Sequence, residues 1–329
     1  MNLATKSEAI VLMNSLGKGQ VPFLFIIDFE MKATRLFPLN KKLPGTVLYD
    51  FESAGKPIAK QGETGNFTFR KFPVSFKEYN RAFEAVQMQI FKGNSFLTNL
   101  TFPTIIETDL TLREIFFKSQ AKYKLLLENE FVCFSPETFI KIIDGTISTF
   151  PMKGTMKATS PESERELLDN TKETAEHNTI VDLLRNDLSM VADSIKVNRF
   201  RYIERIRTHE GELLQVSSEI TGKLPTGYQA KLGEIIFALL PAGSVTGAPK
   251  EKTMSIIQEA EKTDRGYYTG VCGVFDGINL NSAVMIRFIE NHKGVLRFWS
   301  GGGITFLSNA QMEYDELKDK VYVPITRNH

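Results

Sequence analysis

Cysteine is scarce in this sequence, and its distribution is not typical of a disulfide framework or a zinc site. The 329 residues include two cysteines, Cys133 and Cys272, which lie far apart in the chain. Neither has the close spacing of zinc ligands, and a chain with 42% apolar residues can build a large core without disulfides. We therefore expect both thiols to be reduced and buried.

The sequence also lacks long apolar segments and an excess of charge of either sign. No stretch reaches the roughly 18 apolar residues that a membrane-spanning helix needs, and the N-terminus lacks the basic and apolar regions of a secretory signal. Lysine and arginine number 40 against 39 acidic residues, which excludes the positive field that attracts nucleic acid or an anionic membrane. These absences predict a cytoplasmic protein whose partners are small molecules or other proteins.

Hydrophobic periodicity predicts helices and strands in mixed order. Ser75 is a candidate helix N-cap, with Glu78 three residues later as in a capping box, and Asp144–Gly145 is a candidate tight turn between strands. Further helices are predicted at residues 5–16, 161–187, 229–239, 250–260 and 309–320. Strands are predicted at residues 22–29, 95–102, 123–128, 131–135, 139–143, 146–150, 270–275, 283–289 and 295–300. This order, without regular βαβ alternation, predicts an α+β fold with a large antiparallel β-sheet system, a β-sandwich, flanked by helices.

Two glycine-containing segments are candidate anion sites. Gly301, Gly302 and Gly303 directly follow a predicted strand, where glycine permits positive φ and a close approach of backbone amides to a ligand. A flexible turn at the end of the strand is the alternative. The loop PAGSVTGAPK leads into a predicted helix, whose free N–H groups favour a carboxylate or a phosphate.

Acidic side chains gather on two predicted helices. Glu313, Glu316 and Lys320 are spaced by three and four residues, which places them on one helix face. Glu176 lies near the polar beginning of the helix predicted at 161–187. Carboxylates beside a cation suit a magnesium ion that holds an anionic substrate, whereas a solvated face with one ion pair is the alternative. Three more charged residues of the same helix are expected to form structural ion pairs: Asp182, Arg185 and Asp187.

A lysine at the end of a predicted strand is a candidate nucleophile. Lys153 stands between a proline and a glycine in the segment PMKGT. An ordinary surface lysine is the alternative at such a position. A lysine partly removed from water would have a lowered pKa and could attack carbon.

In this order, these elements resemble the family of chorismate-utilising enzymes over residues of about 75–323. The resemblance is carried by the segments SPETF, PMKGT, EHNTIVDLLRND, PAGSVTGAPK, RGYYTG, and GGGI followed by EYDE. It implies a chorismate-binding catalytic domain at residues 75–325 and a reduced N-terminal portion, residues 1–74, that completes the same fold.

The resemblance also implies ligands for the acidic and basic residues. Glu176, Glu313 and Glu316 match the positions that hold Mg²⁺ in the family. The positions that bind substrate match Arg287, Lys320, Tyr268, Thr246 and the backbone of Gly301, Gly302 and Gly303. Chorismate is a dianion, so cations and N–H groups suit it.

Lys153 separates two branches of the family. Members that make 4-amino-4-deoxychorismate carry a catalytic lysine at this position, whereas anthranilate synthases, the alternative here, commonly carry alanine. The resemblance therefore implies attack of Lys153 on C2 of the ring with loss of the 4-hydroxyl, then attack of ammonia on C4. Glu137, in SPETF, matches the general acid and base. Neither cysteine lies in a nucleophile-like glycine turn, so a separate glutamine amidotransferase subunit is expected to supply the ammonia.

Two positions depart from the family pattern. Gln215 stands where many relatives have a histidine, and glutamine cannot exchange a proton at pH 7. Leu97 stands where isochorismate synthases have a base lysine, and leucine cannot activate water. These departures argue against a proton-transfer role at position 215 and against isochorismate synthesis. The absence of a clear tryptophan-binding signature argues against regulation by tryptophan.

Overall fold

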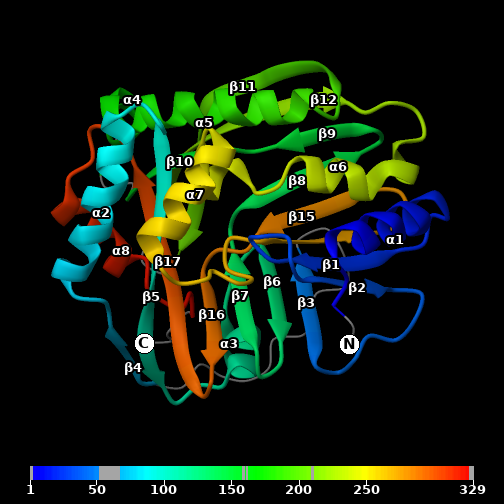
Figure 1. The fold of residues 1–329 in the computed structure, drawn as a ribbon, viewed down its shortest axis with the longest axis horizontal. Coiled ribbons are helices and arrows are strands. Elements are labelled where there is room, and N and C mark those ends of the chain that lie inside the picture. The colour runs from blue at the N-terminus through cyan, green and yellow to red at the C-terminus, as the bar shows by residue number, and fades with distance from the viewer. Residues whose placement is uncertain (1–2, 52–66, 158–159, 161, 209–210, 326–329) are drawn as a thin grey trace.

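Two large antiparallel sheets form the centre of the protein, and helices cover their outer faces (Figure 1). The computed structural model describes residues 3–51, 67–157, 160, 162–208 and 211–325. This arrangement confirms the predicted α+β class with a large antiparallel sheet system. Within these residues, no helix is both long and apolar enough to cross a membrane.

The first sheet has nine strands in the order β10-β12-β9-β8-β15-β14-β1-β2, and β11 pairs with β12. Its strands are β1 (Phe23–Ile27), β2 (Thr34–Pro38), β8 (Thr138–Ile143), β9 (Thr146–Thr149), β10 (Met152–Lys157), β11 (Asp193–Thr208), β12 (Gly211–Lys223), β14 (Val271–Phe275) and β15 (Leu280–Val284). The long β11–β12 pair was not predicted, because its many charged residues interrupt the hydrophobic alternation of a strand.

The second sheet has eight strands in the order β13-β5-β17-β16-β7-β6-β3, and β4 pairs with β5. Its strands are β3 (Val47–Phe51), β4 (Phe69–Phe72), β5 (Leu97–Thr108), β6 (Tyr123–Leu127), β7 (Phe131–Ser135), β13 (Gly247–Ala248), β16 (Phe288–His292) and β17 (Val295–Ile304). Residues before position 75 contribute strands to both sheets, since β1 and β2 belong to the first and β3 and β4 to the second.

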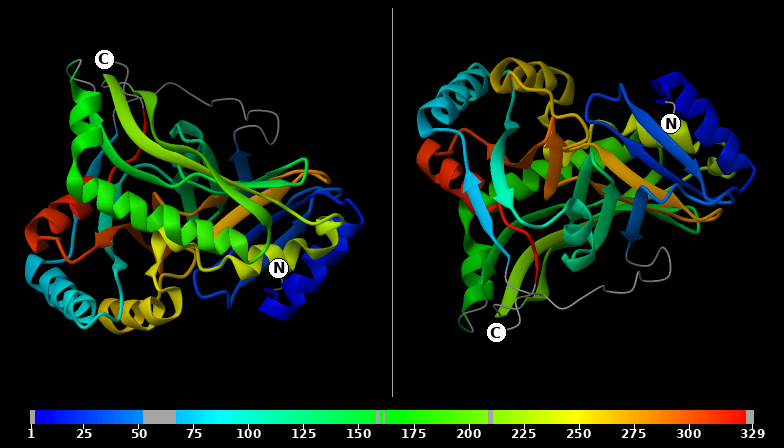
Figure 2. Two further views of the ribbon diagram at one scale, coloured as in Figure 1. Left: turned by 90° about the horizontal axis from the view of Figure 1, so that it is seen from above. Right: turned by 90° about the horizontal axis from the view of Figure 1, so that it is seen from below.

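Eight α-helices and two short 3-10 helices occur in the described part of the chain. They are α1 (Lys6–Lys18), α2 (Phe76–Phe91), α3 (Leu112–Lys118), α4 (Ser163–Asp169), α5 (Thr171–Ser189), η1 (Tyr228–Lys231), α6 (Leu232–Ala238), η2 (Gly243–Val245), α7 (Lys250–Glu261) and α8 (Ala310–Asp319). The helices α1, α5 and α6 pack on the first sheet, whereas α2, α7 and α8 pack on β5 and β17 (Figure 2).

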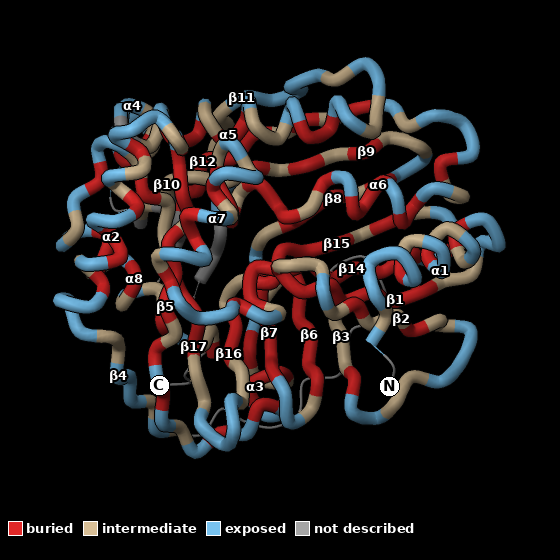
Figure 3. Tube along the Cα trace, in the orientation of Figure 1, coloured by how far each residue is buried: buried red, intermediate tan, exposed pale blue. Residues whose placement is uncertain are grey.

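One layer of the core lies between the two sheets, and a larger one lies between the first sheet and the helices α1, α5 and α6. Buried residues follow the strands of both sheets and the inner faces of the helices (Figure 3). The layer between the sheets includes Leu24 and Ile26 of β1, Leu125 of β6 and Trp299 of β17. Cys133 and Cys272 are buried and unpaired with each other, which confirms the expectation of reduced, buried thiols.

Two predicted elements are interrupted in the structure. The helix predicted at 161–187 is two helices, because Asn170 has an extended backbone and its side chain caps the second helix by accepting from Glu173 N. The strand predicted at 283–289 is interrupted. β15 ends at Val284 and β16 begins at Phe288, and Arg287 between them has a φ of 53°. That turn carries the chain from the first sheet to the second.

Candidate active site

The three consecutive glycines lie within β17. Gly301, Gly302 and Gly303 pair with residues of β5 in a regular antiparallel register. None of them has a positive φ, so the expectation of a glycine-specific backbone conformation at the strand end is wrong. What Gly301 requires is the absence of a Cβ. A Cβ placed on Gly301 would lie 2.4 Å from Leu100 O, closer than any side chain tolerates.

The acidic face of α8 lies over Gly302. A Cβ on Gly302 would lie 3.3 Å from Glu313 Oε2 and 3.7 Å from Glu316 Oε1. Lys320 Nζ lies 2.6 Å from Glu316 Oε1 and donates to Gly301 O at 2.8 Å. Burial lowers the pKa of Lys320, although the Glu316 carboxylate acts in the opposite direction. The strand and the helix thus hold two carboxylates and one ammonium group close together.

The candidate nucleophile lies beside the neighbouring glycine, Gly303. A Cβ on Gly303 would lie 3.3 Å from Lys153 Nζ and 3.7 Å from Glu176 Oε2. Lys153 on β10 donates to Glu176 on α5 over 3.3 Å. Burial alone would lower the pKa of Lys153, but the carboxylates of Glu176, Glu173 and Glu316 outweigh it and raise that pKa above its ordinary value. The amine is therefore protonated in the free protein.

The three candidate magnesium ligands approach the glycines from two sides. Glu176 comes from α5, whereas Glu313 and Glu316 come from α8. Their oxygens are the type of donor that Mg²⁺ prefers. In the described part of the chain, however, no three acidic, histidine or cysteine side chains converge closely enough to hold a metal ion. Glu176 bonds to Lys153 and Glu316 bonds to Lys320, so the donor chemistry fits Mg²⁺ but the carboxylates would have to turn toward it.

Glu137 stands in the short connection between β7 and β8. The hydroxyl of Ser244, in η2, donates to Glu137 Oε1. Burial raises the pKa of Glu137, while that hydrogen bond and the positive charges of Lys153, Arg287 and Lys320 pull it back toward its ordinary value.

Sequence reasoning missed Ser244 and selected Thr246 from the same loop. The Thr246 hydroxyl donates to Ala242 O at 2.8 Å, and its side chain is fully buried. Nothing in the segment PAGSVTGAPK indicates which hydroxyl meets a carboxylate, because the contact depends on how η2 lies against the β7–β8 connection.

Arg287 and Tyr268 occupy the boundary between the site and the core. The Arg287 guanidinium lies 5.4 Å from the centre of the Tyr322 ring, and its charge acts on Glu137 and Tyr268. Tyr268 is buried and stacks on Trp299, with ring centres 5.2 Å apart. Burial raises the pKa of Tyr268, so its hydroxyl stays protonated.

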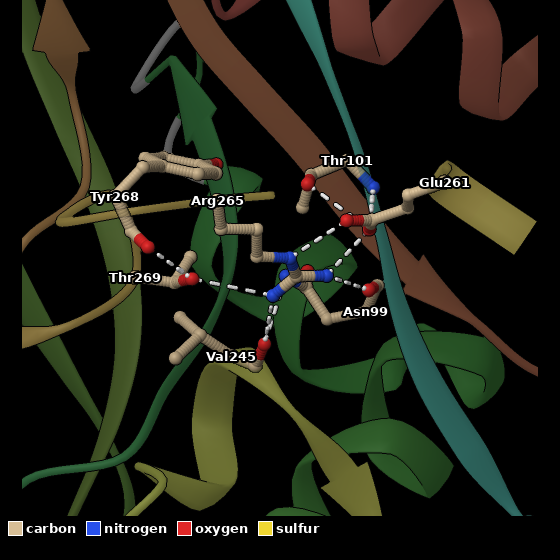
Figure 4. A network of polar contacts seen from close by, with 7 residues as sticks. All are labelled: Asn99, Thr101, Val245, Glu261, Arg265, Tyr268 and Thr269. Carbon is tan, nitrogen blue, oxygen red and sulfur yellow. Dashed lines mark hydrogen bonds and ion pairs between the residues drawn. The ribbon is translucent and has the colours of Figure 1, made fainter. Parts of the chain in front are cut away.

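A buried network behind the site joins four segments of the chain (Figure 4). Arg265 pairs with Glu261 at 2.6 Å, and the side chains of both are at most 2% exposed. Arg265 also donates to Val245 O, Asn99 O and Thr269 Oγ1. Glu261 accepts from the backbone N–H and the hydroxyl of Thr101 on β5. The network fixes the loop that carries Ser244 and the turn that carries Tyr268. The pair was not predicted from the sequence, although an arginine four residues after a glutamate was a visible signal of it.

Replacing Arg265 by methionine should destabilise the protein strongly. The variant leaves the Glu261 carboxylate buried without its partner, so we expect the free energy of unfolding to fall by about 3–5 kcal/mol. Urea unfolding followed by circular dichroism measures this change. The matched control is Arg185→Met, which breaks the exposed pair with Asp182 and should cost less than about 1 kcal/mol. Equal losses in both variants would contradict a special role for the buried pair.

The expected ion pair within the helix is confirmed for Asp182 and Arg185, whereas Asp187 pairs with a residue of another helix. Arg185 pairs with Asp182 at 2.7 Å on the surface of α5, and Asp187 pairs with Lys250 at 2.6 Å. The second pair links the end of α5 to the start of α7. A cavity of about 20 Å³, enough for one water molecule, has Asp187 and Glu137 among its lining residues.

An open pocket borders Glu176. It has a volume of about 180 Å³, and Glu176 and Leu97 form part of its wall. Its outer wall is apolar, with Phe96, Phe306 and Leu307 each more than 60% exposed. Leu97 of its wall also lies next to Gly303 of β17.

Comparison with known proteins relates this site to one enzyme family. A family model described as "chorismate binding enzyme" matches residues 41–326. An uncharacterized PabA-like protein of Haemophilus influenzae is 52% identical, covering 99% of both chains. Aminodeoxychorismate synthase component 1 of Bacillus subtilis is 34% identical over 81% of this chain and 59% of its own length. The menaquinone-specific isochorismate synthase from Escherichia coli has the same fold, with a TM-score of 0.74 over 97% of this chain and 82% of its own, at 15% identity.

Proposed function

Because the chain belongs to the chorismate-binding enzyme family, we propose that it is the chorismate-converting component of an aminodeoxychorismate synthase. Such an enzyme replaces the 4-hydroxyl of chorismate by an amino group from ammonia and releases water. One observation carries the proposal: Lys153 Nζ lies against Gly303 and 3.3 Å from Glu176, inside the site. The relative from Bacillus subtilis, named as such a synthase, supports it.

The substrate's two carboxylates are matched by the positive groups of the site. Lys320 and Arg287 would bind them, and the buried ring of Tyr268 would close one side of the pocket. Thr246 would contribute to the wall of the substrate pocket through its position in the loop, since its hydroxyl is already bonded to Ala242 O. Magnesium held by Glu176, Glu313 and Glu316 would supply further positive charge for a carboxylate of the substrate.

Lys153 and Glu137 divide the chemistry between them. The Lys153 amine must first lose its proton, which the Glu176 carboxylate at 3.3 Å stabilises in the free protein. The amine then bonds to C2 as the ring double bond shifts and the C4–O bond breaks. Glu137, whose pKa is raised by burial, donates a proton to the departing hydroxyl. Ammonia next bonds to C4, the bond from C2 to Lys153 breaks, and Glu137 takes the extra proton of the new amine.

The ammonia would come from a partner protein. Cys133 and Cys272 are each 1% exposed, so neither thiol is accessible to hydrolyse glutamine. We therefore propose a separate glutamine amidotransferase subunit as the donor. The product would serve the synthesis of p-aminobenzoate and folate in the cytoplasm.

The identity of the product tests this function. The chain is incubated with chorismate, magnesium and an ammonium salt, and the products are identified by mass. We expect a compound in which one hydroxyl of chorismate has become an amino group and the enolpyruvyl group is retained. Fluorescent anthranilate together with free pyruvate would establish anthranilate synthase activity in its place. Unchanged chorismate would contradict both functions.

Replacing Ser244 by alanine should shift the pH profile of the reaction. Glu137 acts in its protonated form, so activity falls as pH rises through its pKa. The Ser244 hydrogen bond lowers that pKa, and its removal should move the falling limb to higher pH. We also expect kcat to fall about 10-fold, because Glu137 loses its orientation. Thr246→Ser, which keeps the bond to Ala242 O, is the control and should leave the limb in place. A limb that moves to lower pH in Ser244→Ala would refute this role.

A further inference from the structure

The strand β12 contacts both the strand and the helix that carry the reacting pair. In its register with β10, Lys153 faces Val216 and Met152 faces Ser217. Directly opposed residues of an antiparallel pair project from the same face, and alternate residues along a strand share a face. Ser218 therefore projects from the same face as Lys153, toward α5.

Ser218 makes three hydrogen bonds to three different elements. Its backbone N–H donates to Pro151 O at 3.0 Å, just before β10. Its hydroxyl shares a bond of 2.7 Å with His177 Nε2 on α5 and accepts from Arg201 N on β11 at 2.9 Å. Ser218 is fully buried and His177 is 1% exposed, so water does not compete for these bonds.

The contacts of Ser218 fall next to the two residues that meet in the site. Pro151 stands two positions before Lys153, and His177 directly follows Glu176. One residue thus contacts the start of β10 through its backbone and α5 through its hydroxyl, next to the points from which Lys153 Nζ and Glu176 Oε2 approach to 3.3 Å. The Nδ1 atom of His177 has no hydrogen-bond partner among the described residues, so the Nε2 bond is the polar contact that orients the ring.

Apolar packing alone would define the position of α5 on the first sheet less closely than these hydrogen bonds do. The helix α5 packs on the first sheet through Val181 and Leu188, which lie one turn or more beyond His177. Such contacts are non-directional and allow small shifts of a helix along a sheet. A buried hydrogen bond weakens steeply with distance and angle, so it limits those shifts at the beginning of the helix.

We infer that Ser218 and His177 are positioning residues that set the approach of Lys153 to Glu176 and to the substrate. The inference rests on the proposed function, because the step that it serves is the attack of Lys153 on the ring. A misplacement of about 1 Å at a reacting group costs on the order of 100-fold in rate, while substrate binding is little changed.

Ser218→Ala tests the inference, with Ser217→Ala as the matched control. Both serines are fully buried on β12, but the Ser217 hydroxyl donates to Glu204 on β11, away from α5. We expect Ser218→Ala to lower kcat for ammonia-dependent amination by about 10–100-fold, with KM for chorismate within about twofold. Ser217→Ala should keep kcat near that of the parent chain. Equal kcat values in the two variants would overturn the inference.

Substitutions of His177 provide an independent arm that also covers a failure of Ser218→Ala to fold. His177→Phe keeps a ring beside Phe200 but loses the bond, and should show the same fall in kcat. His177→Gln can still bond to Ser218 and should recover most of the activity. The double variant Ser218→Ala with His177→Phe should be no slower than either single variant, since both remove one interaction. Additive losses, or no recovery with glutamine, would overturn the inference. A parent chain that forms no amino product would overturn the proposed function and this inference with it.

Discussion

Lys153→Ala is expected to abolish the covalent adduct with substrate and to lower ammonia-dependent amination by at least about 10³-fold. The amine of Lys153 is the candidate nucleophile that the structure places beside the glycines of β17. Without it, the displacement of the 4-hydroxyl must occur in one difficult step. Slow direct attack of ammonia on C2 can remain, so traces of an anthranilate-type product are expected from the variant.

Intact-mass measurement checks this prediction directly. The parent chain is quenched after incubation with chorismate and magnesium but without ammonia, and it should carry a substrate-derived adduct. Lys223→Ala is the control, because Lys223 lies in the same sheet and its exposed side chain donates to Thr146, away from the site. The control should form the adduct at the normal rate. The same adduct on Lys153→Ala would show that another residue is the nucleophile.

The double variant Glu313→Gln with Glu316→Gln is expected to lose magnesium-dependent turnover by at least about 100-fold. Both carboxylates lie over Gly302. Glutamine has a side chain of similar shape but carries no negative charge to bind the ion. The fold should persist, because these substitutions preserve the size of the side chains on α8.

Magnesium affinity provides a second measurement that does not depend on turnover. Calorimetric titration of the double variant should show binding weakened at least about tenfold relative to the parent chain. The control is Asp315→Asn, which removes a carboxylate of the same helix that pairs with Lys318 on the surface. That control should bind magnesium normally. Unchanged affinity in the double variant would refute the proposed site.

Local features of the fold were predictable from the sequence because their causes lie within a few residues. The Ser75 side chain accepts from Glu78 N at the start of α2, as the spacing of the two residues indicates. Asp144 and Gly145 both have positive φ values in the turn between β8 and β9. Hydrophobic alternation and motif order were likewise sufficient for the α+β class and the family.

The arrangement of the site depended on contacts between distant segments. Gly303, Lys153 and Glu176 come from three elements. They lie close together because of the strand register within the two sheets and the position of α5 on the first sheet. The sequence identified all three as candidates. It could not show that the carboxylates raise the pKa of Lys153 rather than leaving burial to lower it, because that balance depends on distances across the fold.

The sequence by itself therefore determined which chemical groups are available, where most helices and strands begin, and the family to which the chain belongs. Only the tertiary structure decided that Ser244 rather than Thr246 meets Glu137, and that Ser218 ties β10 to α5. The physical reason is the separation along the chain of the residues that interact. Capping, turns and alternation arise from bonds between near neighbours in the chain, whereas these contacts join residues 41 to 107 positions apart, whose approach is the sum of all the packing between them.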